Sequence, residues 1–188
     1  MANKKCAALT KEQLEEIITT MRSGGAGFRK NEQIATALLL EANLGMRIED
    51  ILALHLKDIV MDGGRYRLNV IEKKTQKKRT FTVPVPVYSF IRIYCDDHNI
   101  ASDQKIFSVG ERQVQKYLKK VVDYLGYEEP IGSHSFRKYF ATEIYKQNNY
   151  DIVLVQKLLQ HSSVATTQRY IDVDQRIDKA LIEQCTLF

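Results

Sequence analysis

The sequence predicts an α+β fold that is mainly α-helical and includes one small antiparallel sheet of three strands. Apolar residues recur at helical spacing along most of the 188-residue chain, whereas one middle section alternates between apolar and polar residues. Hydrophobic residues make up 44% of the chain, which is enough to bury the core of one domain.

Three helices are predicted before the sheet. Residues 10–23 place their apolar side chains on one face, and Thr10 with Gln13 matches a capping box at the start. A second helix near 30–44 ends at Gly45, a residue that readily adopts the left-handed conformation of a helix C-terminus. The stretch IEDILALHL then restarts a helix with acidic residues in its first turn.

The three strands are predicted from LKDIVM, RYRLNVIE and RTFTVPV. In the second, Tyr66, Leu68 and Val70 alternate onto one face. A basic turn, KKTQKK, joins the second strand to the third, and Pro84 and Pro86 end the sheet.

The remainder of the chain is expected to be helical. Gly126 closes one of these helices, and Asp151 is a plausible N-cap for another. A terminal amphipathic helix is predicted after residue 173, with Ile177, Leu181 and Ile182 on its apolar face. The remaining predicted segments are VYSFIRIYCDDH, ERQVQKYLKKVVDYLG, SHSFRKYFATEIYKQ and DIVLVQKLLQ.

Composition narrows the class of protein. The net charge of +5 favours a polyanionic partner, although many basic proteins bind no nucleic acid. Three widely spaced cysteines predict neither a disulfide framework nor a zinc site. No apolar run is long enough to span a bilayer, and the polar start has no signal-like core. We therefore expect a cytoplasmic protein.

Four separated motifs carry the functional prediction: GMRIEDILAL, the KKT turn, HSFRKYFAT and LLQHSSVATTQRY. Together they resemble the tyrosine recombinase, or phage integrase, family, and the resemblance extends from about Leu9 to Tyr170. That family has an arginine after a helix-ending glycine, a hairpin lysine, a His-x-x-Arg helix and a late histidine followed by a tyrosine nucleophile. The residues that match its catalytic set are Arg47, Lys74, His134, Arg137, His161 and Tyr170.

The chemistry explains the two arginines and two histidines. Each alone would fit an ordinary surface or core role, but breaking a phosphodiester without a metal requires fixed cations near the nonbridging oxygens. A guanidinium stays charged and its donors match a phosphate, so Arg47 and Arg137 are candidates for the clamp. His134 shares a helix face with Arg137. The resemblance makes His161 a hydrogen-bond donor to the phosphate.

The resemblance assigns the covalent step to Tyr170. Its phenol would attack the DNA phosphate and form a 3′-phosphotyrosyl bond that stores the energy of the broken linkage, so resealing needs no ATP. The family's general acid is the hairpin lysine, which protonates the leaving 5′ oxygen. We choose Lys74, although Lys73 is adjacent and Lys77 is close.

Other charged residues are expected to support this site. Asp50 matches the family's supporting acidic residue, with Glu49 as the alternative. The other basic residues of the turn are expected to contact DNA phosphates: Lys73, Lys77, Lys78 and Arg79. No Gly-rich phosphate loop or acidic metal-binding cluster is present in the sequence, so neither a metal nor another cofactor is expected.

The expected organisation is a catalytic domain over residues 1–173 and a C-terminal helix or tail over residues 174–188. Family members usually carry a preceding core-binding domain, which this sequence lacks; we favour a piece excised from a longer integrase over a naturally short member. The resemblance implies that the partners are double-stranded DNA recombination sites and that a tetramer forms on DNA, with a monomer possible in isolation. The terminal helix could dock on its own domain or on a neighbouring protomer.

Two other functions remain as alternatives. A type IB topoisomerase uses similar tyrosine chemistry to relax DNA, although the compact LLQHSS-x-x-TTQRY ending argues against it. A noncatalytic DNA-binding module could keep the fold and lose the reaction. The expected function is site-specific recombination, with an integrase or transposon recombinase as first choice over dimer resolution.

Overall fold

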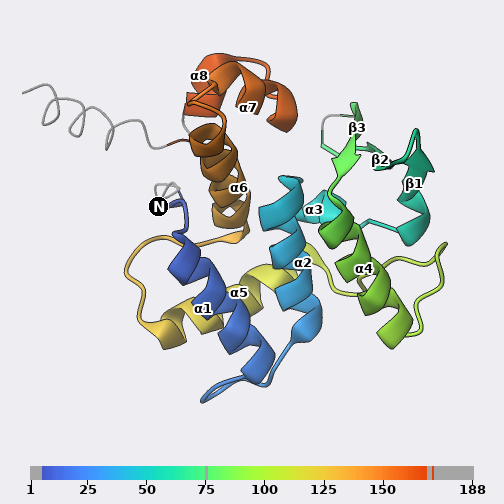
Figure 1. Cartoon of the computed structure of the whole chain (residues 1–188). Coiled ribbons are helices and arrows are strands. Elements are labelled where there is room, and N and C mark those ends of the chain that lie inside the picture. The colour runs from blue at the N-terminus through green and yellow to red at the C-terminus, as the bar shows by residue number, and fades with distance from the viewer. Residues whose placement is uncertain (1–5, 75, 169–170, 172–188) are drawn as a thin grey trace, which may run out of the picture.

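The computed structural model describes residues 6–74, 76–168 and 171. In this part of the chain, the helices pack together and a three-stranded antiparallel sheet lies to one side of them (Figure 1). The prediction of a mainly helical α+β fold with one small sheet is therefore confirmed.

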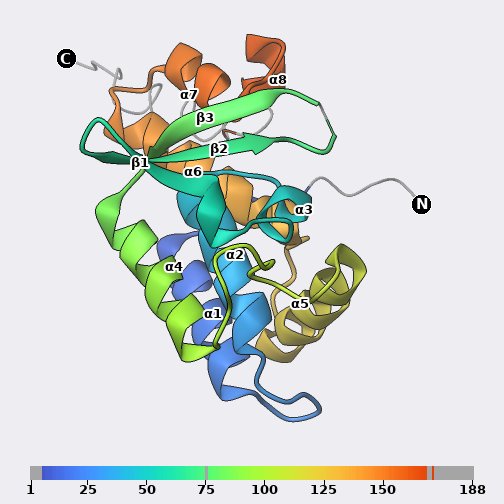
Figure 2. The same cartoon turned by 90° about the vertical axis from the view of Figure 1, so that its right-hand side faces the viewer.

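Helices α1 (Lys11–Ser23) and α2 (Glu32–Leu44) form as predicted. Thr10 and Gln13 make both hydrogen bonds of the capping box. Helix α2 is almost entirely buried and packs against α1, α3 and α6, so it runs through the centre of the fold (Figure 2). It ends at Gly45 in the left-handed conformation, with φ of +56°.

The third helix is shorter than predicted. Only α3 (Ile48–Ile51) is α-helical, and a 3₁₀ turn, η1 (Leu56–Asp58), follows. The carbonyl of Leu54 accepts a hydrogen bond from the backbone N–H of Ile106, and the Asp58 carboxylate accepts one from the N–H of His55. These tertiary and capping partners replace the hydrogen bonds that a continuing helix would make.

The sheet consists of β1 (Ile59–Asp62), β2 (Arg65–Ile71) and β3 (Lys78–Val83), paired antiparallel in that order. The central strand places Leu68 opposite Ile59 on one side and Phe81 on the other. Leu68 is completely buried, and Tyr66 and Val70 pack against the same core, which confirms the predicted inward face of β2.

Four of the five later helices match the predicted segments, and the short helix at residues 164–168 was not predicted. Pro84 precedes α4, and Asp151 caps α7 by accepting backbone hydrogen bonds from Val153 and Leu154. The predicted terminal helix lies outside the described residues. The five helices after the sheet are α4 (Val85–Asp97), α5 (Glu111–Leu125), α6 (Ser133–Gln147), α7 (Ile152–Leu159) and α8 (Val164–Gln168).

Two apolar clusters hold these elements together. The larger one joins α1, α2, α4, α5 and the sheet, and a smaller one lies between α6 and α7. Between them, the C-terminal end of α2 meets α6, while the side chain of Gln160 after α7 donates to the carbonyl of Lys78 on β3. This arrangement brings the four sequence motifs into one region. Among the described residues, no helix is long and apolar enough to cross a membrane.

Candidate active site

Arg137 lies at the floor of the site. It is on the second turn of α6 and its side chain is completely buried. Nη1 donates to the carbonyl of Gly45 at 2.6 Å, and Nη2 donates to the carbonyl of Leu159 at 3.0 Å. These carbonyls belong to the C-terminal ends of α2 and α7, where helix dipoles place partial negative charge. Two helix ends therefore stabilise the buried guanidinium.

Arg47 precedes α3 and contacts Glu72, the residue that follows strand β2. Its Nη1 donates to Oε2 of Glu72 at 2.6 Å, and the Arg47 side chain is 14% exposed whereas the Glu72 side chain is fully buried. Across residues 6–74, 76–168 and 171, no other hydrogen bond from the Arg47 side chain is found. Arg47 is thus held at one atom and retains further donors for a ligand.

Arg79 corrects one of the sequence predictions. It was expected to contact DNA, but it is 2% exposed, and its Nη atoms donate to Glu72 and to the carbonyls of Leu44 and Gly45. Burial lowers the pKa of Arg79 to about 10, and the charge of Arg137 acts in the same direction. Its Nη atoms make three hydrogen bonds, one of them to the Glu72 carboxylate that also holds Arg47, so Arg79 supports the site from inside.

The two histidines lie near these arginines and favour the neutral form. Burial, together with the charges of Arg137 and Arg47, lowers the pKa of His161 to about 4. Nδ1 of His161 lies 3.1 Å from the Thr167 hydroxyl. The pKa of His134 is also lowered, first by burial and then by Arg137, Arg47 and Lys74. A neutral imidazole has one N–H to donate and cannot add to the positive charge.

Lys73 and Lys74 of the hairpin have different surroundings. The charge of Lys74 reaches His134 and lowers its pKa. Lys73 instead lines a separate hollow with Asp50, Asn69 and Val70. Of these two lysines, Lys74 is the one whose charge acts on His134, and its assignment as the general acid stays a prediction. Lys77 and Lys78 are exposed near the base of the hairpin turn.

Asp50 connects the arginine segment to this hairpin. Its Oδ1 accepts a hydrogen bond of 2.9 Å from the backbone N–H of Lys73, and the residue is 5% exposed. Burial raises the pKa of Asp50, whereas the hydrogen bond from Lys73 lowers it. Glu49, the alternative, is half-buried and makes no such contact with the hairpin among the described residues. The contact favours Asp50 as the supporting acid.

A second buried acid, Glu41, was not singled out from the sequence. It lies on the last turn of α2 and is completely buried. Burial raises its pKa well above the usual range, although the charge of Arg137 opposes this. Burial of this carboxyl and the nearby charge of Arg137 therefore shift its pKa in opposite directions, and burial dominates.

Tyr170, the predicted nucleophile, lies outside the described residues, as does Thr75 of the hairpin. The structure thus brings together Arg47, Lys74, His134, Arg137 and His161, and it leaves the assignment of Tyr170 to the sequence. Helix α8 ends at Gln168, two residues before it.

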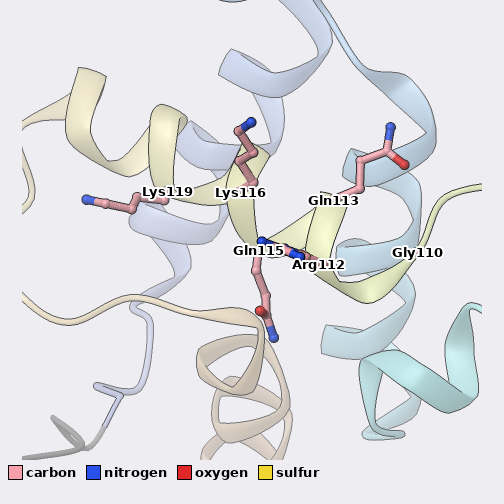
Figure 3. Close-up of a pocket in the computed structure, with 6 residues that line it drawn as sticks. All are labelled: Gly110, Arg112, Gln113, Gln115, Lys116 and Lys119. Atoms are coloured by element: carbon pink, nitrogen blue, oxygen red, sulfur yellow. The ribbon is translucent and has the colours of Figure 1, made fainter.

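A separate basic surface lies on α5. Arg112, Lys116 and Lys119 are exposed there and line a shallow hollow with three neighbouring residues (Figure 3). Lys119 pairs with Asp123 at 2.9 Å, while the hollow itself is lined by cationic and amide side chains. This surface is on the outer face of α5, because Val114 and Leu118 occupy the buried face.

Comparison with known proteins identifies the family of this chain. The sequence profile of the phage integrase family matches residues 7–176, so the chain belongs to that family and carries its tyrosine recombinase catalytic domain. The probable integrase/recombinase YoeC of Bacillus subtilis is 30% identical over 158 residues, covering 80% of this chain and 83% of the relative.

Solved structures share the fold. XerH recombinase bound to a palindromic difH substrate, in a post-cleavage complex, has a TM-score of 0.67 at 23% identity, covering 95% of this chain and 53% of that one. The catalytic domain of bacteriophage HP1 integrase has a TM-score of 0.64 at 18% identity, covering 88% and 86%. The chain spans about half the length of several curated recombinases that it matches, including XerH of Helicobacter pylori.

For Glu72 and Arg79, strand alternation in the sequence indicates the buried position that the structure shows. The inward face of β2 continues by alternation from Leu68 and Val70 to Glu72. On β3, the same alternation groups Arg79 with Phe81 and Val83 on the inner side. Strand periodicity therefore predicts that both charges point inward, even though they lie in a basic turn region.

Proposed function

We propose that this chain cleaves and rejoins DNA as the catalytic domain of a site-specific recombinase, with Tyr170 as the nucleophile. The observation that carries the proposal is the convergence of two arginines and two neutral histidines beside the Lys74 hairpin. Fixed cations of this kind stabilise the charge that develops on a phosphate in the transition state. Family membership supplies the reaction class.

The proton balance follows from the residue types. Tyr170 attacks phosphorus and passes its phenolic proton to water, and the bond from phosphorus to the 5′ oxygen breaks. Lys74 supplies the proton to that oxygen, which leaves as a hydroxyl while a 3′-phosphotyrosyl bond remains. Arg47 and Arg137 stabilise the phosphate, and His134 and His161 donate neutral hydrogen bonds. Attack by a 5′ hydroxyl on the phosphotyrosyl bond reverses these steps and rejoins the strand.

DNA affinity would come from exposed cations around the cluster. Lys73, Lys77 and Lys78 remain the hairpin candidates, because their side chains are exposed while Arg79 is buried. The basic surface of α5 is a further candidate for phosphate contacts. Such contacts strengthen binding without reading the base sequence, and they weaken as salt rises.

The test is trapping of the covalent intermediate. The full-length protein is incubated, without added metal, with a nicked suicide duplex selected by its Tyr170→Phe variant from a random-sequence library. We expect an SDS-resistant protein–DNA adduct that Tyr170→Phe abolishes and that Tyr124→Phe, a change at a half-exposed tyrosine on α5, preserves. If the unaltered protein forms no adduct on its selected site, the chain is a DNA-binding module and the proposal fails.

A second assay separates recombination from DNA relaxation. Two copies of the selected site are placed on one supercoiled plasmid, and products are resolved on a gel. Exchanged or excised circles would support a recombinase that assembles as a tetramer on paired sites, whereas relaxed plasmid alone would identify a topoisomerase-like activity.

A further inference from the structure

We propose that Glu72 is a positioning residue for cleavage, acting through Arg47. This inference rests on the proposed function, because it assigns a role within the same site. The Glu72 carboxylate contacts two arginines and also belongs to the hairpin that carries Lys74. One buried side chain thereby fixes the phosphate-binding arginine relative to the general acid.

The contacts form a continuous path beneath the site. Oε2 of Glu72 accepts from Arg47 at 2.6 Å, and Oε1 accepts from Arg79 at 3.1 Å. Arg79 donates onward to the carbonyl of Gly45 at 3.2 Å, and the same carbonyl accepts from Arg137 at 2.6 Å. Both candidate phosphate-binding arginines are therefore linked through Glu72, Arg79 and the end of α2.

The physical role follows from burial. A carboxylate with no exposed surface is costly unless it is paired, and Glu72 is paired on both oxygens. A free arginine side chain has about 2 kcal/mol of rotamer entropy, so holding Arg47 at Nη1 before DNA binds removes much of that cost from the reaction. Glu72 does not need to touch DNA in order to contribute.

Glu72 also closes the hairpin turn with its main chain. Its N–H donates to the carbonyl of Lys77 at 3.0 Å, and its carbonyl accepts from the N–H of Gln76 at 2.9 Å. Lys74 lies inside this turn. A shift of Glu72 would therefore move the lysine and release Arg47 together, and displacement of about 1 Å at a reacting centre can slow a reaction about 100-fold.

The test compares Glu72→Gln with the unaltered full-length protein in the adduct assay, on the selected suicide duplex. We expect adduct formation at saturating DNA to slow about 10- to 100-fold while half-saturation changes less than about 3-fold. Asp62→Asn is the matched control, because Asp62 also pairs with an arginine on the same sheet but is exposed, and it should leave the rate unchanged.

A neutral substrate distinguishes positioning from loss of folding. With a methylphosphonate at the scissile position, one nonbridging oxygen is replaced by methyl and less charge develops for Arg47 to stabilise. The defect of Glu72→Gln should then shrink several-fold. An equal defect on both substrates would overturn the inference, since a misfolded fraction would reduce both rates alike.

The remaining outcomes of the experiment also test the role of Glu72. Should Glu72→Gln prove unfolded by circular dichroism, Glu72→Gln combined with Arg79→Met removes the unpaired buried cation, and the same rate comparison applies. A variant that cleaves at the unaltered rate sinks this inference alone. A lack of adduct from the unaltered protein contradicts the proposed function, so the two failures are distinguishable.

Discussion

The carbonyl of Gly45 accepts a 2.6 Å hydrogen bond from Nη1 of Arg137, so the left-handed end of α2 determines where this guanidinium lies. Two features of the structure require glycine at position 45. Its φ of +56° is unfavourable for residues with a Cβ, and an added Cβ would lie 2.2 Å from Cδ1 of the Phe140 ring. The position of a catalytic candidate thus depends on a backbone conformation at the end of another helix.

We expect Gly45→Ala to reduce both stability and cleavage. The left-handed conformation costs about 1–2 kcal/mol for alanine, and the contact with Phe140 adds about 1–3 kcal/mol of overpacking. Gly64→Ala is the control, because Gly64 has φ of +75° but open space around it. Urea unfolding should therefore show a clearly larger loss for Gly45→Ala. Equal losses would mean that the Phe140 contact is relieved at little cost.

Arg79→Met should reduce stability, whereas Lys78→Met should reduce the salt dependence of DNA binding. Loss of the buried Arg79 leaves Glu72 with one partner fewer, so the free energy of unfolding should fall by about 3 kcal/mol. Lys78 is exposed, so its loss should leave stability nearly unchanged and reduce the salt slope of DNA binding by about one. Denaturant melts and salt-dependent binding curves measure both. A reduced salt slope for folded Arg79→Met would contradict its internal role.

Asp50→Ala should slow cleavage more than Glu49→Ala does. Asp50 holds the backbone N–H of Lys73, next to the general-acid candidate Lys74, and its removal frees the start of the turn. We expect roughly a 10-fold or larger loss in the rate of adduct formation for Asp50→Ala, in the range seen when a residue supporting a site is removed. Similar rates for the two variants would show that this hydrogen bond does not position the lysine.

The pH dependence of stability should have two limbs. Since His161 has a folded pKa of about 4, below its ordinary value of 6.5, the unfolded chain binds more protons than the folded chain between these values. Stability from this group is therefore full above pH 6.5 and is lost as pH falls toward 4, by on the order of 1–3 kcal/mol. His134 acts in the same direction. Melting temperatures across pH 4–8 should show the acid limb, and His161→Asn should flatten it.

Glu41 produces the opposite limb. Its folded pKa is raised by burial, so its contribution is full below the ordinary value of 4.5 and is lost as pH rises toward the folded pKa. Glu41→Gln keeps the shape of the side chain and should remove this loss, making the variant relatively more stable at pH 8 than at pH 5. Glu49→Gln serves as the control. If Glu41→Gln leaves the alkaline limb intact, another group causes it.

Much of the fold could be predicted from sequence because local signals and tertiary packing agree. The capping residues Thr10 and Asp151, the glycine at 45 and the alternation around Leu68 each specify an element that the structure contains. The segment after Ile51 differs, because Leu54 finds a backbone partner at Ile106, more than fifty residues later. Helical periodicity does not reveal such a partner.

The residue types of the candidate site could be predicted from the sequence. Which of these residues face a ligand and which lie beneath the site could not. Motif spacing identified Arg47, His134 and Arg137, and the structure places them together. The sequence motifs did not distinguish an arginine that faces a ligand from one that supports the ligand-binding group from inside. Arg79 and Glu72 differ from the exposed lysines nearby only through the side of the strand on which they lie.

The path from Arg47 through Glu72, Arg79 and Gly45 to Arg137 has a consequence for the chain during its synthesis. Its hydrogen bonds join residues 25, 34 and 92 positions apart. Domains fold as units while the ribosome still adds residues, but this path cannot close until α6 has left the exit tunnel. An unfinished chain, even one with α2 and the hairpin already folded, therefore lacks the paired arginines of the candidate site.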